Sequence, residues 1–421
     1  MESKHNSPSH SSSPSVQEPP PSSSFTSTEI ELIKEIQESW MAKNTCFDFD
    51  FLNARNSQNY SDGQSRTSVA SVKVFNTYRD DVERLSFLEQ KLLNAVQIMI
   101  HDWTENIVQE KSDDNDCSKE LVMKWFDKLI SLHSKQERAY HTFCHIEEMF
   151  GFVDLFFRNN QHAEKQQQQH YGGDNDNVIK QEEEENIHYD NKLYYALISI
   201  CIFFHDAIYD AKSSTNEEDS LNLYKTFEKE LFQHIMQKNF HDEDTWTSKD
   251  SHVNMRIEPK TKAIPQLPWK YSTKVSLFIL ATKSHNLDNV DLCGHEDHKE
   301  CLKYLKLFLD ADMAVLGKDH NAYDHYASLI RKEYIHVPHD VYCEKRAEVL
   351  QSFVSVVSNV AKEKTDVSDK NVSINREKAQ SNKTRYIFAS KIMREALEKR
   401  AINNLQREIG GLKQGKIPRF S

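Results

Sequence analysis

The sequence predicts an all-α protein. Only 9 glycines occur in 421 residues, whereas turn-dense β architectures need glycine for tight turns. The same scarcity leaves no glycine-rich loop of the kind that cradles a phosphate. Apolar residues instead recur at helical spacing, at Ile30, Ile33, Ile36 and Trp40, at Leu85, Leu88, Leu92, Val96 and Met99, and at Leu121, Val122, Trp125, Phe126, Leu129 and Ile130.

Composition divides the chain into a tail, a helical extension and one large domain. Residues 1–26 are rich in Ser and Pro without an apolar core segment, so we expect a disordered tail and neither a signal peptide nor a spanning helix. Residues 27–120 form a helical extension with a linker, and its helices could dock on the main domain or recruit a protein partner. Residues 121–412 form the domain, and residues 413–421 form a closing tail.

Three polar stretches interrupt the large domain. They span about residues 159–186, 241–268 and 362–383. The free energy of closing a loop grows only logarithmically with its length, so one core tolerates such insertions. We therefore predict a single core of helices with solvated loops inserted between them.

Charge and cysteine usage exclude several classes of protein. The net charge is −12 and no basic stripe interleaves with aromatic residues, which argues against binding a DNA or RNA polymer. The 7 cysteines are odd in number and scattered, as in a reducing compartment. The longest apolar stretch, residues 193–204, is shorter than the roughly 20 residues that cross a bilayer. We expect a soluble cytoplasmic protein without membrane association, with nuclear residence left open.

Two apolar segments carry polar residues that suit a metal. His141 and His145 are four residues apart, so on a helix both rings project from one face. Such a pair can also consist of hydrogen-bonded core residues. His205 and Asp206 end a nearly continuous apolar run, where an unpaired buried charge would cost several kcal/mol. A divalent cation would satisfy both side chains, and the alternative is a buried His–Asp hydrogen bond without metal.

A third apolar helix contains two carboxylates. Asp310 and Asp312 diverge on a helix, so we expect one to ligate directly while the other orients a neighbour or faces solvent. Three separate apolar helices each carry an inward His or Asp, which is hard to explain as coincidence. This favours metal binding. A second pattern with zinc-ligand residue types occurs at Cys293, His295, His298 and Cys301. Structural zinc sites usually have two ligand pairs that are farther apart, so we expect a polar loop at these positions.

These residues resemble a known family. Arg138-x-x-His141, His205-Asp206 and Ala311-Asp312 are similar to the HD superfamily of metal-dependent phosphohydrolases, defined by a His, an adjacent His-Asp pair and a distal Asp on different helices. A narrower resemblance is to the predicted HD-type phosphohydrolases found widely in bacteria. Its motifs are Tyr140-His141-x-x-x-His145-Ile146, Phe203-Phe204-His205-Asp206-x-x-Tyr209-Asp210, Asn216-Glu217-Glu218-x-Ser220, Ala281-Thr282-Lys283-x-His285, Phe308-Leu309-Asp310-Ala311-Asp312, Leu316-Gly317, Ile330-Arg331-x-Glu333-Tyr334, Arg346-x-x-Val349-Leu350 and Leu397-Glu398-x-x-Ala401-x-x-Asn404-Leu405.

The resemblance covers about residues 121–412 apart from the insertions, and it implies an all-α HD-domain helical bundle with a metal site. The implied ligands of the first metal are His141, His205, Asp206 and Asp312. The mixed nitrogen and oxygen set suits a divalent ion without sharp preference, whether Mn, Fe, Zn, Ni or Mg. A second metal or the substrate would use His145, His285 and Asp310. The family often carries paired histidines where this chain has Ser284-His285.

Catalytic roles follow from the same resemblance. Asp210, one helical turn past Asp206, and Glu217 are candidate general acids or bases. Glu217 lies at a predicted helix start and could serve as a cap instead. The candidate clamps for phosphate oxygens are Arg138, Lys283, Arg331 and Arg346, each of which could instead pair with a structural carboxylate.

The leading hypothesis is therefore a metal-dependent phosphohydrolase that attacks a small phosphate ester or nucleotide with a metal-activated water. One alternative keeps the fold and houses a diiron oxygenase, with His145 and His285 as ligands. The other is a non-catalytic interaction protein, in which the metal is structural and the N-terminal helices bind a partner.

Overall fold

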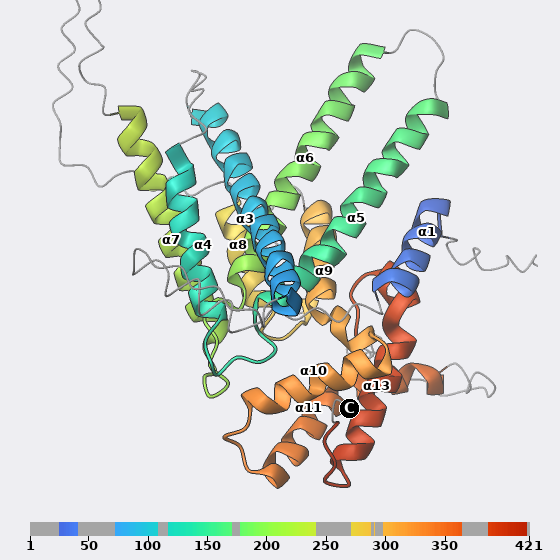
Figure 1. The fold of residues 1–421 in the computed structure, drawn as a ribbon. Helices are drawn as coiled ribbons and strands as arrows, with labels where there is room; N and C mark the ends of the chain where they lie inside the picture. Colours follow the sequence, from blue (N-terminus) through green and yellow to red (C-terminus); the bar gives the residue numbers. More distant parts are fainter. Residues whose placement is uncertain are drawn as a thin grey trace, which may run out of the picture.

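The computed structural model describes residues 25–40, 72–107, 117–170, 177–240, 271–287, 290, 298–363 and 386–418. Throughout these ranges the regular structure is helical and no strand occurs, so the predicted all-α class is confirmed (Figure 1). None of the helices in these ranges is both long enough and apolar enough to cross a membrane. The Cys293 and His295 of the second zinc-ligand pattern lie outside the described residues, whereas Cys301 is buried.

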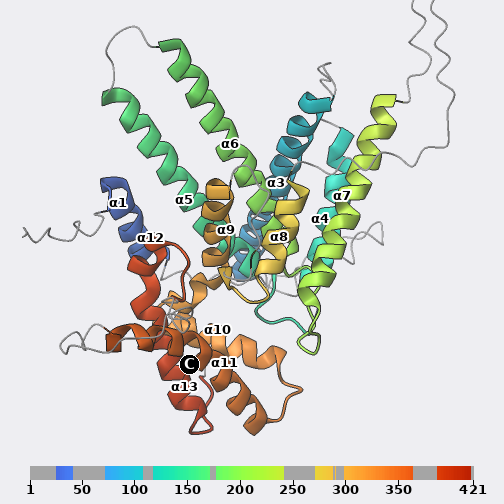
Figure 2. The ribbon, with the colours of Figure 1, turned by 180° about the vertical axis from the view of Figure 1, so that it is seen from behind.

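The helices form two groups. The first is a bundle of long helices, α3 (Val72–Ile107), α4 (Cys117–His133), α5 (Phe143–His170), α6 (Asn177–Phe204), α7 (Asn216–Phe240), α8 (Ser272–Ala281) and α9 (His298–Met313). The second gathers at one end of this bundle in both views (Figures 1 and 2). It contains η3 (Ala314–Gly317), α10 (His320–Glu333), α11 (His339–Glu363), α12 (Lys391–Met393), η4 (Arg394–Glu398) and α13 (Lys399–Leu412).

The long helix of the N-terminal extension packs into the bundle. Its apolar face is buried against α6 and α4 through Leu85, Leu88, Leu92, Val96 and Met99. Ion pairs from Arg84 to Glu147 and from Lys91 to Asp154 connect α3 to α5 at 2.9 and 2.7 Å. Of the two roles that the sequence left open for this helix, docking on the main domain is the one observed.

The first helices of the extension join the C-terminal group. In α1 (Ser27–Glu35) and η1 (Ile36–Trp40), Ile33 and Ile36 are buried, while Ile30 is exposed. These helices contact α5, α12 and η4 (Figure 2). Segments from opposite ends of the chain therefore share one core.

The first predicted insertion differs from expectation. Residues 159–170 continue α5 and residues 177–186 belong to α6, where we predicted a solvated loop. The reason is that Gln, Glu and Lys are good helix formers, so a polar segment can extend a helix beyond its packed part. The other two insertions fall largely outside the described residues, as does the predicted tail up to residue 24.

Two residues of the terminal motifs hold the C-terminal group together. The side-chain amide of Asn404 donates to the carbonyls of Leu316 and Lys318, both at 2.9 Å. Gly317 lies so close to η4 that an added Cβ would approach the Leu397 Cβ to 2.7 Å. The turn between α9 and α10 is therefore fixed against α13 and η4.

Substituting Gly317→Ala should destabilise the fold by about 1–3 kcal/mol, because the methyl group overlaps Leu397 and the packed helices must shift. Gly410→Ala is the matched control, since nothing lies within 4 Å of a Cβ at that position of α13. Its stability should be unchanged or higher, because alanine is the better helix former. Thermal or urea unfolding of both variants checks this, and equal stabilities would contradict the packing described.

Candidate metal centre

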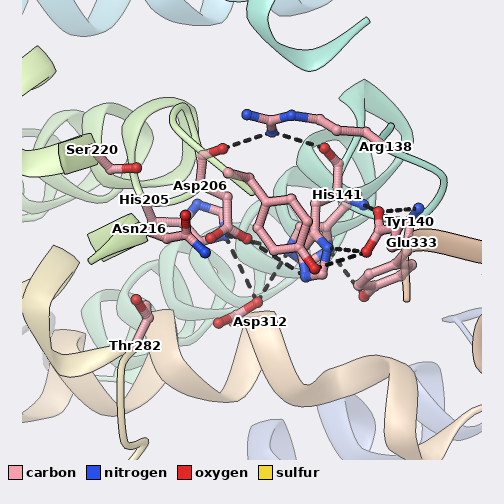
Figure 3. Close-up of polar contacts among 12 residues, drawn as sticks. Arg138, Tyr140, His141, His205, Asp206, Asn216, Ser220, Thr282, Asp312 and Glu333 are labelled. Carbon is pink, nitrogen blue, oxygen red and sulfur yellow. Dashed lines mark hydrogen bonds and ion pairs between the residues drawn. The ribbon is translucent and has the colours of Figure 1, made fainter. Parts of the chain in front are cut away.

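Helix ends bring the predicted ligands together. His145 lies in the first turn of α5 and His141 in the turn that precedes this helix, not on it as predicted. His205 and Asp206 directly follow α6, because the helix ends at Phe204. Asp312 is in the last turn of α9. Figure 3 shows the side chains of His141, His205, Asp206 and Asp312 pointing toward one another from separate segments.

The centre of the cluster is formed by His145, His205 and Asp312. One ligand atom from each lies within 4.8 Å of the others, so the three residues could hold a metal ion. The His145 Nε2 is 3.0 Å from the Asp312 Oδ1 and 3.3 Å from the His205 Nε2. The sequence assigned His145 to a second metal or the substrate, whereas the structure gives it a central place.

Three further ligand-type groups surround this centre. The Asp206 Oδ2 lies 3.2 Å from the His205 Nε2 and 3.9 Å from the His141 Nε2. On the other side, the His285 Nε2 is 2.8 Å from the Asp312 Oδ2. The rings of His145 and His205 are almost fully buried, while the side chains of His141, Asp206, His285 and Asp312 are 14–20% exposed. Solvent therefore reaches the cluster around its two central rings.

The cluster is strongly ionic. Burial opposes a charged ring at His205, yet Asp206 and Asp312 raise its pKa to about 9. Burial would also raise the pKa of Asp312, but hydrogen bonds from His145 and His285 hold it well below its usual range. The carboxylates are therefore charged and are compensated by protonated imidazoles, and a bound cation would take the place of those protons.

The far nitrogen of each central ring has a partner of its own. The Nδ1 of His205 lies 2.9 Å from the carbonyl of Ile202, so it carries a proton. The Nδ1 of His141 is 2.7 Å from a carboxylate oxygen of Glu333, and that of His145 is 3.1 Å from the Tyr140 hydroxyl. Metal-binding histidines characteristically use the second nitrogen in this way. The donor set and its orientation therefore fit a divalent ion.

Arg138 is a scaffold residue, which corrects the prediction of a phosphate clamp. Its guanidinium donates to the carbonyls of His141, Asp206 and Ala207 at 3.0, 2.7 and 2.7 Å (Figure 3). The side chain is buried, and burial lowers its pKa to about 10. Backbone carbonyls in a turn that follows a helix need hydrogen-bond donors. Arg138 provides them to Asp206 and Ala207, in the turn that follows α6.

The other predicted clamps also have partners within the protein. Arg331 donates to the carbonyls of Tyr334 and Val337 and so caps the end of α10. Arg346 forms a buried ion pair with Glu408 at 3.1 Å. Lys283 contacts Glu218 and donates to the Ser214 carbonyl at 3.0 Å, but its side chain is 44% exposed. Of the four predicted clamps, Lys283 is the exposed one and is therefore the best placed to meet an anion from solvent.

Asp210 lies in a loop instead of one helical turn past Asp206. Its backbone is held by the Asn216 side chain through two hydrogen bonds of 3.0 Å, and its Oδ1 accepts from the Lys212 amide. Ser220 holds the same loop through the backbone of Ile208. The loop that follows Asp206 is thereby attached to the start of α7, which also carries Glu217.

Asp310 is not brought to the cluster. Its two carboxylate oxygens accept hydrogen bonds from the amides of Ala389 and Ser390 at 2.6 and 2.9 Å. Burial raises its pKa to about 7. Because residues two apart diverge on a helix, Asp312 faces the site while Asp310 holds the segment before α12.

Glu333, Tyr209 and Tyr140 support the ligands, and no role was predicted for them. Glu333 carried a recognisable signal, since it follows Ala327 and Ile330 at helical spacing on the buried face of α10. A carboxylate at a core position needs partners. The partners themselves lie far away in the sequence and have no local pattern.

Arg138→Lys should destabilise the protein by about 2–3 kcal/mol, because one ammonium cannot replace the guanidinium bonds to three buried carbonyls. The control is Arg158→Lys, at a partly exposed surface pair 3.8 Å from Glu35, which should change stability by less than about 0.5 kcal/mol. Unfolding without any substrate measures both. If Arg138→Lys were as stable as the parent and only bound phosphate less tightly, Arg138 would be a phosphate clamp after all.

No protein-family model, no curated protein and no solved structure matches this chain. The expected membership of the HD superfamily therefore rests on the motifs quoted above and their order along the chain. To these the structure adds that six ligand-type side chains from four of the motifs lie in one cluster.

Proposed function

We propose that the chain is an HD-type, metal-dependent phosphohydrolase that acts on a small phosphate ester or nucleotide. The observation that carries this proposal is that one ligand atom each of His145, His205 and Asp312 lies within 4.8 Å of the others, close enough to hold one cation. His141 and Asp206 lie directly beside them. Imidazoles and carboxylates that converge from distant helices are expensive to bury without such a role.

A divalent ion held by these residues would supply a bound water of lowered pKa as the nucleophile. The protein's own contribution is to fix the rings, through the carbonyl of Ile202 and the side chains of Glu333 and Tyr140. Asp210 and Glu217 lie on the loop and helix start that follow Asp206, where they could accept or donate a proton at the solvent side.

The charge distribution favours a small anionic substrate. Arg138 and Arg331 are committed to backbone carbonyls, whereas Lys283 is at the surface beside Glu217, 4.0 Å away. With a net charge of −12, a polyanion would be repelled by the protein as a whole. A single phosphate group needs only the local positive charge of the metal and one lysine.

Asp312→Asn should lower the affinity for Mn²⁺ by about 100-fold or more and abolish metal-dependent phosphate release, because it removes a charged ligand at the centre of the cluster. Asp340→Asn, in the exposed first turn of α11, is the control and should behave as the parent. Calorimetry and a panel of phosphomonoesters and nucleotides give the two readouts. Metal-loaded parent protein that releases no phosphate across the panel would argue against the function.

A second candidate, the HD-fold diiron oxygenase, is favoured by one observation. His145 and His285 both contact Asp312, so four imidazoles and two carboxylates are close enough to serve two ions. His285 also holds a left-handed backbone conformation with φ 49°, which is uncommon outside glycine and is often retained at functional sites.

The diiron candidate predicts two irons per chain and substrate-dependent oxygen consumption. His285→Gln should then reduce the iron content from two to one, because it removes an imidazole from one side of the cluster. Elemental analysis and an oxygen electrode make the measurement. One ion per chain in the parent protein would exclude this candidate and leave the hydrolase.

A further inference from the structure

The Glu333 carboxylate at the end of α10 is surrounded by hydrogen-bond donors. Its Oε1 accepts from the amides of Ala139, Tyr140 and His141 at 2.8, 2.8 and 3.0 Å. Its Oε2 lies 2.7 Å from the His141 Nδ1 and accepts from the Tyr209 hydroxyl at 3.0 Å (Figure 3). The side chain is fully buried. One carboxylate thus connects α10, the turn before α5 and the loop after α6.

This contact determines which nitrogen of His141 is available. An ionised carboxylate only accepts hydrogen bonds, so the Nδ1 of His141 must carry the proton. The Nε2, 3.9 Å from the Asp206 Oδ2, is then the nitrogen left to bind a metal. The ring is also stacked on Tyr209, with centroids 4.1 Å apart and planes inclined by 29°. Both the protonation pattern and the orientation of the ring follow from Glu333 and its partners.

We propose that Glu333 is a positioning residue through which the C-terminal helix α10 sets the metal affinity of the cluster. The inference rests on the proposed metal site, because His141 must be a ligand for its orientation to matter. It also gives the C-terminal helices a role in the site, to which they contribute none of the six ligand-type groups described above. Partners of this kind typically change metal affinity by about 10- to 100-fold when they are removed.

Glu333→Gln tests the proposal with little change of shape. Three backbone amides surround one oxygen, so the amide oxygen of glutamine should take that place. The NH₂ group then faces the Nδ1 of His141 and can only donate to it. The ring must accept at Nδ1 and carry its proton on Nε2, which occupies the lone pair that a metal needs.

Glu398→Gln is the matched control. Glu398 is another buried carboxylate of the C-terminal group, and its two oxygens accept from the amides of Ile387 and Phe388 at 2.8 and 3.1 Å. It contacts none of the six ligand-type groups. Both glutamine variants should lower the unfolding temperature, but only Glu333→Gln should change the metal site.

The experiment titrates full-length parent, Glu333→Gln and Glu398→Gln with Mn²⁺ alone and follows binding by calorimetry. We expect affinity to fall by about 10- to 100-fold in Glu333→Gln and to be unchanged in Glu398→Gln. Nitrogen NMR of the metal-free proteins, recorded at a pH where the ring is neutral, should show His141 protonated at Nδ1 in the parent and at Nε2 in Glu333→Gln. Neither readout would move if Glu333 only stabilised the fold.

Parent affinity in folded Glu333→Gln would overturn the inference. Parent protein that binds no divalent metal would instead refute the proposed function, and the NMR tautomer would still decide whether Glu333 orients the ring. Should Glu333→Gln not fold, Glu333→Asp replaces it, because the shorter carboxylate cannot reach the three amides and the ring together. Weaker Mn²⁺ binding would support the inference, and unchanged binding would overturn it.

Discussion

The placement of two half-buried carboxylates, Asp206 and Asp312, between apolar helices is the constraint on which the rest of this structure depends. A charge removed from water is costly unless it is paired and hydrogen bonded. Here the compensation comes from imidazoles that arrive from four places along the chain, at distances of 2.8–3.9 Å. The end of α6, the end of α9 and the start of α5 must therefore meet at one point, which fixes how these helices pack.

The same constraint explains the polar residues around the cluster. Because α6 ends at Phe204, the carbonyls of Asp206 and Ala207 in the following turn have no place in a helix and need donors, which Arg138 supplies. The turn before α5 has unpaired amides for a similar reason, and Glu333 accepts them. The guanidinium of Arg138 and the carboxylate of Glu333 thus hold the turn after α6 and the turn before α5, which carry His205, Asp206 and His141. Both residues support the cluster through the backbone without contact to a substrate.

Much of the fold and of the cluster could be predicted from the sequence. Apolar periodicity identified the helices, and an apolar run that ends in His205 and Asp206 can hardly be buried without partners. The same pattern could not identify those partners, because Glu333 and Arg138 are assigned by contacts between distant segments. It also could not distinguish a loop from a projecting helix in residues 159–186, since glutamine and glutamate suit both. The central place of His145 depends on the rotation of α5, which four-residue spacing leaves undetermined.

The commitment of Arg138, Arg331 and Arg346 within the protein bears on how an anionic substrate would be recognised. Direct charge recognition is left to the cluster and to Lys283, whose partner Glu218 is 44% exposed. Exchanging a solvent-exposed ion pair for a phosphate costs little, because such pairs contribute about 0–1 kcal/mol. Lys283, in the turn after α8, donates to the Ser214 carbonyl, so this turn and the loop from Tyr209 to Asn216 lie side by side. Ser220 and Asn216 hold this loop through the backbone of Ile208 and Asp210. The exposed side chains of Lys212, Ser213 and Ser214 can therefore differ without disturbing the charges of the cluster.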